Sequence, residues 1–428
     1  MVTFHEIFSK EKNVLHKNDQ FVVLLILPLA MIVLAFTYDN PVAVIRGINK
    51  IRLSNDVLLT DYMLLGGMGS ALFNSAVVTL INLWLIYRLE LKPNGIIISS
   101  LFLISGFSFI GKNMFNIWPF YLGGWLYAQV HKIEFKNVFI ICMLSTALSP
   151  LISVLVLSLR YDLTVSLFLT IIIGAFLGYV MPAVSSQVLL AHSGYSIYNM
   201  GFAGGLMGIL VFSILKALKI PVQTNLIVSA SSDDRLNWFF TLYFILLILY
   251  GFFTNGRSFS GYSKLLSRSG RLVTDMTRLD GFSLSTINMG IMGLISILYV
   301  LLMGGVINGP TIAGILTVSG FAAFGKHPRN CLSILAGVAL SAKILSMDIA
   351  STQVIIAGLF ATTLAPIVGE YGFSYGFVLG FLHLVMTFNI GALHGGVFLY
   401  NNGLSGGLVA TLFVPMLDAL KKEKQDAI

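Results

Sequence analysis

Histidine, tyrosine and asparagine occur at fixed spacing in a segment that the chain contains twice. The copies run from His192 to Leu206 and from His394 to Leu408, and both follow H-x5-Y-N-x-G-x2-G-G-L, 202 residues apart. An imidazole can relay protons, an amide offers two donors and two acceptor sites, and glycines let backbone approach closely. The candidate substrate-binding residues in these copies are His192, Tyr198, Asn199, Gly204 and Gly205, with His394, Tyr400, Asn401, Gly406 and Gly407.

A second repeated pattern, Gly-Lys-x3-Asn, places a lysine between two short apolar runs. It contains Lys112 and Asn116 in one copy and Lys326 and Asn330 in the other, 214 residues apart. The pattern is not a phosphate-binding loop, which requires Gly-x4-Gly-Lys-Ser/Thr. If the two short runs form a re-entrant hairpin, the lysines lie inside the membrane and favour an anionic substrate. These four residues are also candidate substrate-binding groups.

Each pattern also has a structural explanation. The histidines can cap helices or contact loops at the membrane surface, glycine pairs pack membrane helices closely, and a lysine between helices can snorkel to the surface. Asp61 and Asp275 precede apolar runs, and we expect them at the membrane interface, although Asp61 could instead couple protons or sodium. An asparagine in an apolar setting needs hydrogen-bond partners. We therefore rank Asn199 and Asn401 first among the candidates.

The composition indicates a multi-pass membrane protein. Of 428 residues, 57% are hydrophobic and only 10% are charged, whereas soluble domains carry about 25% charged residues. Apolar runs of roughly 17–25 residues, the length of a membrane-spanning helix, recur along the chain. The net charge of +8 is scattered between these runs, which indicates contact with lipid head groups rather than nucleic acid. We expect no cofactor, metal site or enzyme activity, because the usual catalytic and metal-binding motifs are missing.

The chain is a tandem duplication. Asn74 and Asn288 keep the 214-residue offset of the Gly-Lys pattern. We expect an all-α integral membrane protein of about 12–14 transmembrane helices in two halves, with re-entrant segments left open. The apolar runs that predict helices in the first half lie near 20–38, 62–88, 95–111, 113–130, 137–159, 164–190 and 195–218. Those of the second half lie near 237–256, 283–303, 308–324, 328–345, 351–369, 373–391 and 394–418.

An odd number of spans per half turns the second half upside down relative to the first, as in many secondary transporters. If Tyr195–Leu218 is re-entrant, the repeats are instead parallel. Basic residues before residue 283 and at the C-terminus predict that both are cytoplasmic. The predicted organisation is a cytoplasmic segment 1–19, a first membrane repeat 20–218, a loop 219–236, a second repeat 237–420 and a cytoplasmic tail 421–428.

Two segments of the chain show a family resemblance. Gly111-Lys-Asn-Met-Phe-Asn116-Ile-Trp-Pro and His394-Gly-Gly-Val-Phe-Leu-Tyr-Asn401-Asn-Gly resemble a family of uncharacterised bacterial multi-pass membrane proteins built from a repeated domain of unknown function. This resemblance covers most of the chain and implies no substrate. The Tyr198-Asn199 and Tyr400-Asn401 segments are more faintly similar to those of urea transporters. The Leu-Pro-x2-Thr pore signature is missing, so only the idea of two matched half-sites is taken from that likeness.

The function we expect is transport of a small polar or anionic solute across the bacterial inner membrane, along a path between the repeats. A coupling proton or sodium ion and a homo-oligomer are compatible with this expectation, and membrane lipid is the expected surrounding. One alternative is a channel-like facilitator of a small neutral solute. Another is a membrane-embedded lipid-processing enzyme that uses the histidines, although no carboxylate accompanies them in the sequence.

Overall fold

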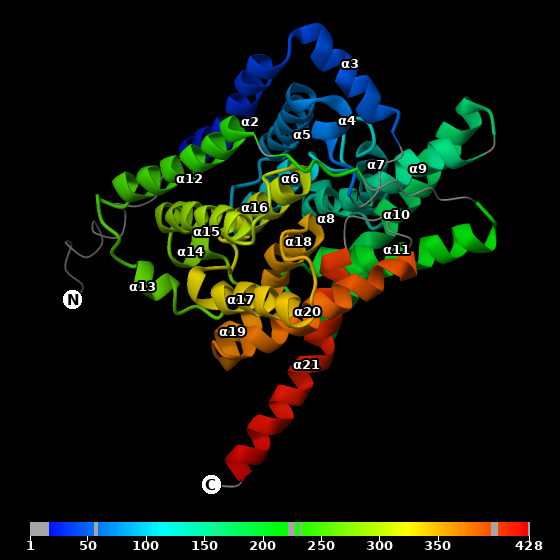
Figure 1. The fold of residues 1–428 in the computed structure, drawn as a ribbon. Coiled ribbons are helices and arrows are strands. Elements are labelled where there is room, and N and C mark those ends of the chain that lie inside the picture. Colours follow the sequence, from blue (N-terminus) through cyan, green and yellow to red (C-terminus); the bar gives the residue numbers. More distant parts are fainter. Residues whose placement is uncertain are drawn as a thin grey trace.

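A computed structural model describes residues 17–54, 59–159, 161–220, 227–231, 233–394 and 401–426, with backbone only at 17, 18, 394 and 421–426. Within these ranges, ten helices are long and apolar enough to cross a membrane, and two shorter apolar helices accompany them. Apart from one β-bridge between Thr60 and Ile227, the described residues form helices, turns and loops (Figure 1). The protein is an all-helical, multi-pass membrane protein.

The first repeat begins with two helices joined by a short turn and ends with two long helices. Its α-helices are α2 (Lys17–Tyr38), α3 (Pro41–Arg52), α4 (Tyr62–Gly66), α5 (Met68–Arg88), α6 (Gly95–Phe107), α7 (Trp118–Val130), α8 (Phe139–Ser145), α9 (Ser149–Ser158), α10 (Leu163–Ala191) and α11 (Asn199–Ala217). Short 3-10 turns η2 (Phe135–Asn137) and η3 (Thr146–Leu148) flank α8.

The second repeat follows the same order. Its α-helices are α12 (Asp234–Thr254), α13 (Tyr262–Leu265), α14 (Met276–Leu279), α15 (Phe282–Leu302), α16 (Gly309–Phe321), α17 (Pro328–Ile344), α18 (Thr352–Ala361), α19 (Ala365–Tyr371), α20 (Tyr375–Ile390) and α21 (Asn401–Asp426). The 3-10 turn η4 (Thr362–Leu364) joins α18 to α19, and η5 (Gly391–His394) follows α20. Each predicted apolar run has its helical counterpart here.

Several helices are broken where a continuous one was predicted. The run 62–88 divides at Gly67, whose φ of 95° suits glycine and ends α4. In both repeats a 3-10 turn interrupts the span that precedes the last two long helices. Pro150 and Pro366 lie four residues after Thr146 and Thr362, so each lacks the N–H that would bond that threonine carbonyl. The interruptions are therefore encoded at matched positions.

The repeats point in opposite directions. Helices α6 and α16 are equivalent and lie side by side near the centre of the molecule (Figure 1). A Cβ on Gly106 would lie 2.9 Å from Ala313 Cα, and one on Gly320 would lie 3.3 Å from Ser99 Cα. The two contacts pair the end of each helix with the beginning of the other, so the helices run antiparallel. This antiparallel packing is what the predicted inverted relationship requires.

Helices α6 and α16 are too short to cross a bilayer. Each has 13 residues, or about 20 Å of helix, against a hydrocarbon core of about 30 Å. All residues of α16 are buried, as are all of α6 except Ile96. Both helices are therefore enclosed by protein, and the Gly-Lys turns that follow them are enclosed too.

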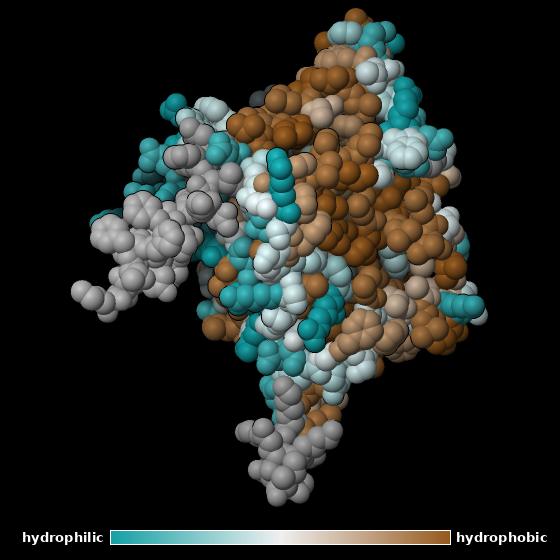
Figure 2. Space-filling model, turned by 90° about the vertical axis from the view of Figure 1, so that its left-hand side faces the viewer, coloured by the Kyte–Doolittle hydropathy of each residue, from teal (hydrophilic) through white to brown (hydrophobic). Residues whose placement is uncertain are grey.

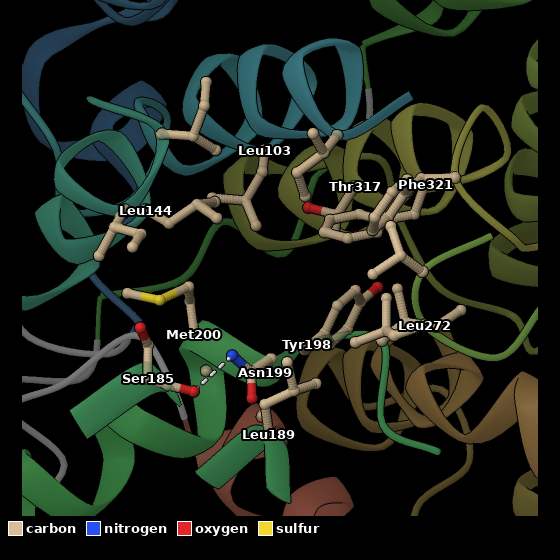
Figure 3. A pocket seen from close by; sticks show the side chains of 18 of the residues that line it. Leu103, Leu144, Ser185, Leu189, Tyr198, Asn199, Met200, Leu272, Thr317 and Phe321 are labelled. Atoms are coloured by element: carbon tan, nitrogen blue, oxygen red, sulfur yellow. Dashed lines mark hydrogen bonds between the residues drawn. The ribbon is translucent and has the colours of Figure 1, made fainter. Parts of the chain in front are cut away.

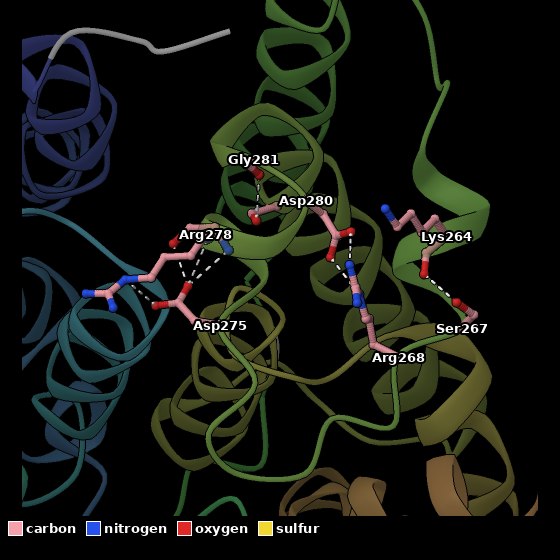
Figure 4. Close-up of polar contacts among 9 residues, drawn as sticks. Lys264, Ser267, Arg268, Asp275, Arg278, Asp280 and Gly281 are labelled. Carbon is pink, nitrogen blue, oxygen red and sulfur yellow. Dashed lines mark hydrogen bonds and ion pairs between the residues drawn. The ribbon is translucent and has the colours of Figure 1, made fainter. Parts of the chain in front are cut away.

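Each short helix is capped by an aspartate from the opposite repeat. Asp61 accepts hydrogen bonds from the backbone N–H groups of Gly309, at 3.3 Å, and Ser229, at 3.2 Å. Asp275 accepts one from Gly95 N–H at 3.0 Å and pairs with Arg278 at 3.6 Å (Figure 4). Carboxylates satisfy the free N–H groups of a helix N-terminus. This exchange of caps links the two repeats.

The outer surface suits a bilayer. Figure 2 shows apolar side chains over a broad band of one face, with hydrophilic residues gathered towards its edges. Large apolar side chains that are more than half exposed occur in both repeats, including Val33, Phe168 and Trp238. In water such a surface would be costly, whereas lipid tails cover it without loss.

Candidate functional site

The described Asn-Gly parts of the two repeated segments pack against each other, where α11 and α21 begin. A Cβ on Gly403, at the start of α21, would lie 2.6 Å from the Cα of the equivalent Gly201 in α11. The neighbouring contacts are also reciprocal, because Gly205 packs on Leu404 while Gly407 packs on Phe202. The helices α11 and α21 are therefore related by a local two-fold axis where they cross. Only glycines permit two backbones to come this close.

A cavity of about 290 Å³ lies beside this crossing, between the repeats. Figure 3 shows Leu103, Leu144, Leu272 and Phe321 around it, with Tyr198 also on its wall. We call it the first cavity. The few polar side chains on its wall are Ser185, Ser186, Tyr198, Asn199, Thr317 and Asn402, and none of the described lining residues is charged. An apolar pocket with a few polar groups is typical of sites for small molecules.

A second cavity of about 160 Å³ is the counterpart of the first in the other half. Its Thr387 and Asn401 occupy the positions that Ser185 and Asn199 occupy in the first cavity, 202 residues earlier. Asn402 lines both cavities. The two repeats thus line cavities at equivalent positions, and Asn402 lies on the wall of both.

A family model for proteins of unknown function, DUF1576, matches residues 40–217 and again 254–419. The chain belongs to this family. The matches begin at residues 40 and 254, a difference of 214, and end at 217 and 419, a difference of 202. These are the offsets of the two repeated patterns, so each match covers one structural repeat apart from its first long helix, α2 or α12. Neither a curated protein nor a solved structure matches the chain significantly.

The first-ranked asparagines hold equivalent positions in the two DUF1576 repeats. Asn199 Nδ2 donates to Ser185 O at 3.0 Å, and Asn401 Nδ2 donates to Thr387 O at 2.9 Å. Each bond ties the start of the last helix of a repeat to the preceding helix. Both asparagines also line a cavity, so their amides combine a structural role with a place on the wall.

His192 holds the loop that leads into α11. Its Nε2–H donates to Asn199 Oδ1 at 2.9 Å, and Ser196 N–H donates to its Nδ1 at 3.3 Å. These two bonds require the neutral imidazole with the proton on Nε2. Burial lowers the pKa of His192, against the opposing effect of the Asn199 contact. The side chain of His394 and the whole of Tyr400 lie outside the described residues.

Lys326 reaches across from the second repeat to the first. Its side chain is fully buried, and Nζ donates to Tyr198 Oη and, at 2.6 Å, to Thr362 Oγ1 in the interrupted helix. Tyr198 N–H in turn donates to Thr363 Oγ1 at 2.9 Å. The Tyr-Asn motif of one half therefore meets the Gly-Lys motif and the helix break of the other.

Lys112, the equivalent of Lys326, is also fully buried, but its Nζ has no hydrogen-bond partner among the described residues. It lies 5.4 Å from the ring centre of Phe107, while Lys326 lies 5.6 Å from that of Phe321. Both rings line the first cavity. The alternative of a lysine that snorkels to the surface is wrong for both residues, because neither is exposed.

The other candidates have mainly internal contacts. Asn116 Nδ2 donates to Gly111 O at 3.0 Å, and Asn330 Nδ2 donates to Gly325 O at 2.9 Å, so each closes its own Gly-Lys turn. Neither lines a described cavity. The glycines pack helices: Gly204 is buried in α11, and a Cβ on Gly406 would lie 2.3 Å from Thr363 Cγ2.

Asn402 was missed because the repeated motif has no fixed residue there, Met200 being its counterpart. The only sequence signal was the Asn-Asn pair at 401–402. Among the described residues of this DUF1576 chain, no group of three or more His, Cys, Asp or Glu side chains could hold a metal ion.

Proposed function

We propose that this DUF1576 protein is a membrane transporter that moves a small polar or anionic solute along a path between its two repeats. The observation that carries the proposal is the pair of matched cavities that share Asn402 beside the crossing of α11 and α21. A solute in one half-site has an equivalent half-site on the other side of the crossing. Inverted repeats with a central site are the usual architecture for such transport.

The interrupted helices support transport over a purely structural role. Backbone that departs from α-helix inside a membrane protein is tolerated where protein encloses it or where it lines a cavity. The breaks η3 and η4 lie at matched positions in the two repeats. In η4, the carbonyl oxygen of Thr363 accepts a hydrogen bond from Ile197 N–H of the first repeat at 3.0 Å. Interrupted helices of this kind can change their contacts without unfolding whole spans.

The buried lysines favour an anion among polar solutes. Lys112 and Lys326 lie behind Phe107 and Phe321 on the wall of the first cavity, and no described carboxylate lines that wall. Electrostatic interactions act over longer distances in a medium of low dielectric constant than in water. Burial disfavours the charged form of both lysines, and a negative solute in the cavity would offset that cost.

Alternating access is the mechanism that we favour. On one side of the first cavity, loops from the two repeats are joined: Leu272 N–H donates to Gly194 O at 3.0 Å, and Arg271 Nε to Ser193 O at 2.8 Å. Leu272 lines the cavity, while Arg271 and Ser193 line a polar groove of about 680 Å³ beyond it. Separation of these loops would connect the cavity with the groove.

The proposal includes a bacterial inner membrane, with the C-terminus in the cytoplasm. The basic loop before α15 is consistent with that side, although Arg268 is paired with Asp280 at 3.0 Å (Figure 4). A coupling proton or sodium ion and a homo-oligomer remain part of the proposal. Catalysis by His192 is disfavoured, because both of its ring nitrogens already make hydrogen bonds inside the loop.

The proposal is tested with purified protein in proteoliposomes. Saturable uptake or exchange is measured for a panel of small carboxylates, phosphate, nitrate and neutral amides, for wild type, Asn199→Ala and Asn401→Ala. Transport by wild type that both variants lose, while they remain folded, supports the assignment. Wild type that transports no solute of the panel, but is stabilised by a particular lipid, would favour the lipid-processing enzyme instead.

A further inference from the structure

Asn402 is a buried polar residue whose side-chain oxygen has no protein partner. Only 5% of the residue is exposed, and Oδ1 makes no hydrogen bond to any described residue. The neighbouring Asn401 has its Nδ2 bonded to Thr387 O, and Asn199, in the other repeat, uses both Nδ2 and Oδ1. The unsatisfied amide therefore differs from the two asparagines that the repeated motif conserves between the halves.

An unsatisfied buried amide is costly. Leaving one such polar atom without a partner costs about 1–3 kcal/mol relative to a satisfied one. The other repeat has Met200 at the equivalent position, also buried and also on the wall of the first cavity. A thioether would fill the same space without an unmet hydrogen bond, so the fold itself does not require the amide.

The location of Asn402 suggests what satisfies it. It is one residue from the contact of Gly201 with Gly403, and it lines both cavities. A solute in either cavity can therefore come within reach of this amide. The wall of the first cavity is otherwise largely apolar, and Lys112 and Lys326 lie beside Phe107 and Phe321 of that wall.

We propose that Asn402 is a specificity-determining residue that hydrogen-bonds the head group of a small organic anion with an apolar body. The proposal rests on the transport function above and names the substrate class of the same path. An amide can turn so that its Nδ2–H faces an oxyanion or its oxygen faces an N–H group. The apolar wall accepts the body of the solute, and the volume of the first cavity restricts that body to a short chain.

The test uses hexanoate and hexanamide, which share one apolar body and differ in charge. Dissociation constants come from ligand-dependent thermal stabilisation of the purified full-length protein. Wild type is expected to bind hexanoate more tightly than hexanamide. Asn402→Asp is expected to weaken the binding of hexanoate by about tenfold or more, because a carboxylate repels an anion. It should retain the binding of hexanamide, because a carboxylate still accepts a hydrogen bond from N–H. Asn402→Met, which copies the residue of the other repeat, is expected to weaken both.

Asn389→Asp is the matched control, because Asn389 is exposed on α20 and lines neither cavity, so the same change of an amide to a carboxylate takes place outside the site. Unchanged hexanoate affinity in Asn402→Asp would overturn the role of Asn402 and leave the transport proposal intact. If that variant does not fold, unchanged hexanoate affinity in Asn402→Met has the same meaning. Wild type that binds neither compound would instead overturn the substrate class, and wild type that binds hexanoate without transporting it would overturn the transport function alone.

Discussion

The ammonium group of Lys326 in the second repeat donates a hydrogen bond to the phenol of Tyr198 in the first. The equivalent Lys112 has no such partner among the described residues, and Tyr400, the equivalent of Tyr198, lies outside them. The two halves of a duplicated chain thus place the same lysine in two different settings. Alternating-access models require such a difference between inverted repeats, since exchange of their conformations opens the opposite side.

Lys326→Met should weaken the binding of an organic anion without unfolding the protein. The variant removes the amine whose protonated form would attract an anion in the first cavity, and hexanoate affinity should fall by about tenfold or more. Stability without ligand should change little, because loss of the hydrogen bonds to Tyr198 and Thr362 opposes the gain from removing a buried amine. Thermal unfolding with and without hexanoate measures both effects.

Lys343→Met is the control for that substitution, because this lysine is in α17 of the same repeat but is exposed. It removes the same formal charge outside the site and should leave hexanoate affinity unchanged. Equal losses in the two variants would mean that overall charge, rather than the position of Lys326, determines anion binding.

Gly403→Ala should destabilise the crossing of α11 and α21. The added Cβ would lie 2.6 Å from Gly201 Cα, and backbone cannot move aside as a flexible side chain can. A loss of about 1–3 kcal/mol is expected, as for other overpacked contacts, together with loss of transport. Gly391→Ala is the control, since the nearest atom to its added Cβ is Asn401 Nδ2 at 3.6 Å. A melting temperature of Gly403→Ala equal to that of the control would contradict the close crossing.

The helices and the duplication could be predicted from sequence because both leave a one-dimensional signal. Apolar runs mark spans, and constant offsets mark equivalent residues such as Asn74 and Asn288, whose Nδ2 groups donate to Lys112 O and Lys326 O at 2.8 and 2.7 Å. The break at Gly67 was not predicted, because apolar residues continue on both sides of it. One glycine in an apolar run does not by itself indicate a positive φ.

The partners of the candidate residues could not be predicted, because they depend on how the halves pack. Nothing in the sequence links Lys326 to Tyr198, which lies 128 residues away in the other repeat. Asn402 was missed for a different reason. A search for repeated residues finds what the halves share, whereas a residue that distinguishes the two half-sites occurs where the repeats differ, here Asn402 against Met200.

Asp61→Ala should destabilise the contact between repeats rather than one helix. It removes the acceptor for three backbone N–H groups, those of Met63, Ser229 and Gly309, and the last belongs to the buried start of α16. Loss of a helix cap costs about 0.5–2 kcal/mol of stability. The loss for Asp61→Ala should be near the upper end of this range, because buried N–H groups are left without partners. Asp61→Asn, which keeps one acceptor, should be intermediate in thermal unfolding.

Asp162→Ala is the comparison for that loss, because Asp162 is exposed and caps α10 of its own repeat through Thr164 N–H at 3.0 Å. The melting temperature should be highest for Asp162→Ala, intermediate for Asp61→Asn and lowest for Asp61→Ala. If Asp162→Ala melted at as low a temperature as Asp61→Ala, the cap between the repeats would contribute no more to stability than a cap within one repeat.

His192 should make the protein sensitive to mild acid. The neutral ring accepts Ser196 N–H on Nδ1 and donates from Nε2 to Asn199, so a second proton on Nδ1 would remove the first bond. Burial lowers the pKa of His192 below its ordinary value of 6.5. The unfolded chain therefore binds this proton more readily than the folded protein, and stability should fall as the pH drops below about 6.5 towards the folded-state pKa.

His192→Gln should reduce this pH dependence of stability between pH 7.5 and 5.5, measured by thermal unfolding. The control His131→Gln, which changes an exposed histidine, should not reduce it. An unchanged pH dependence in His192→Gln would mean that other groups control it.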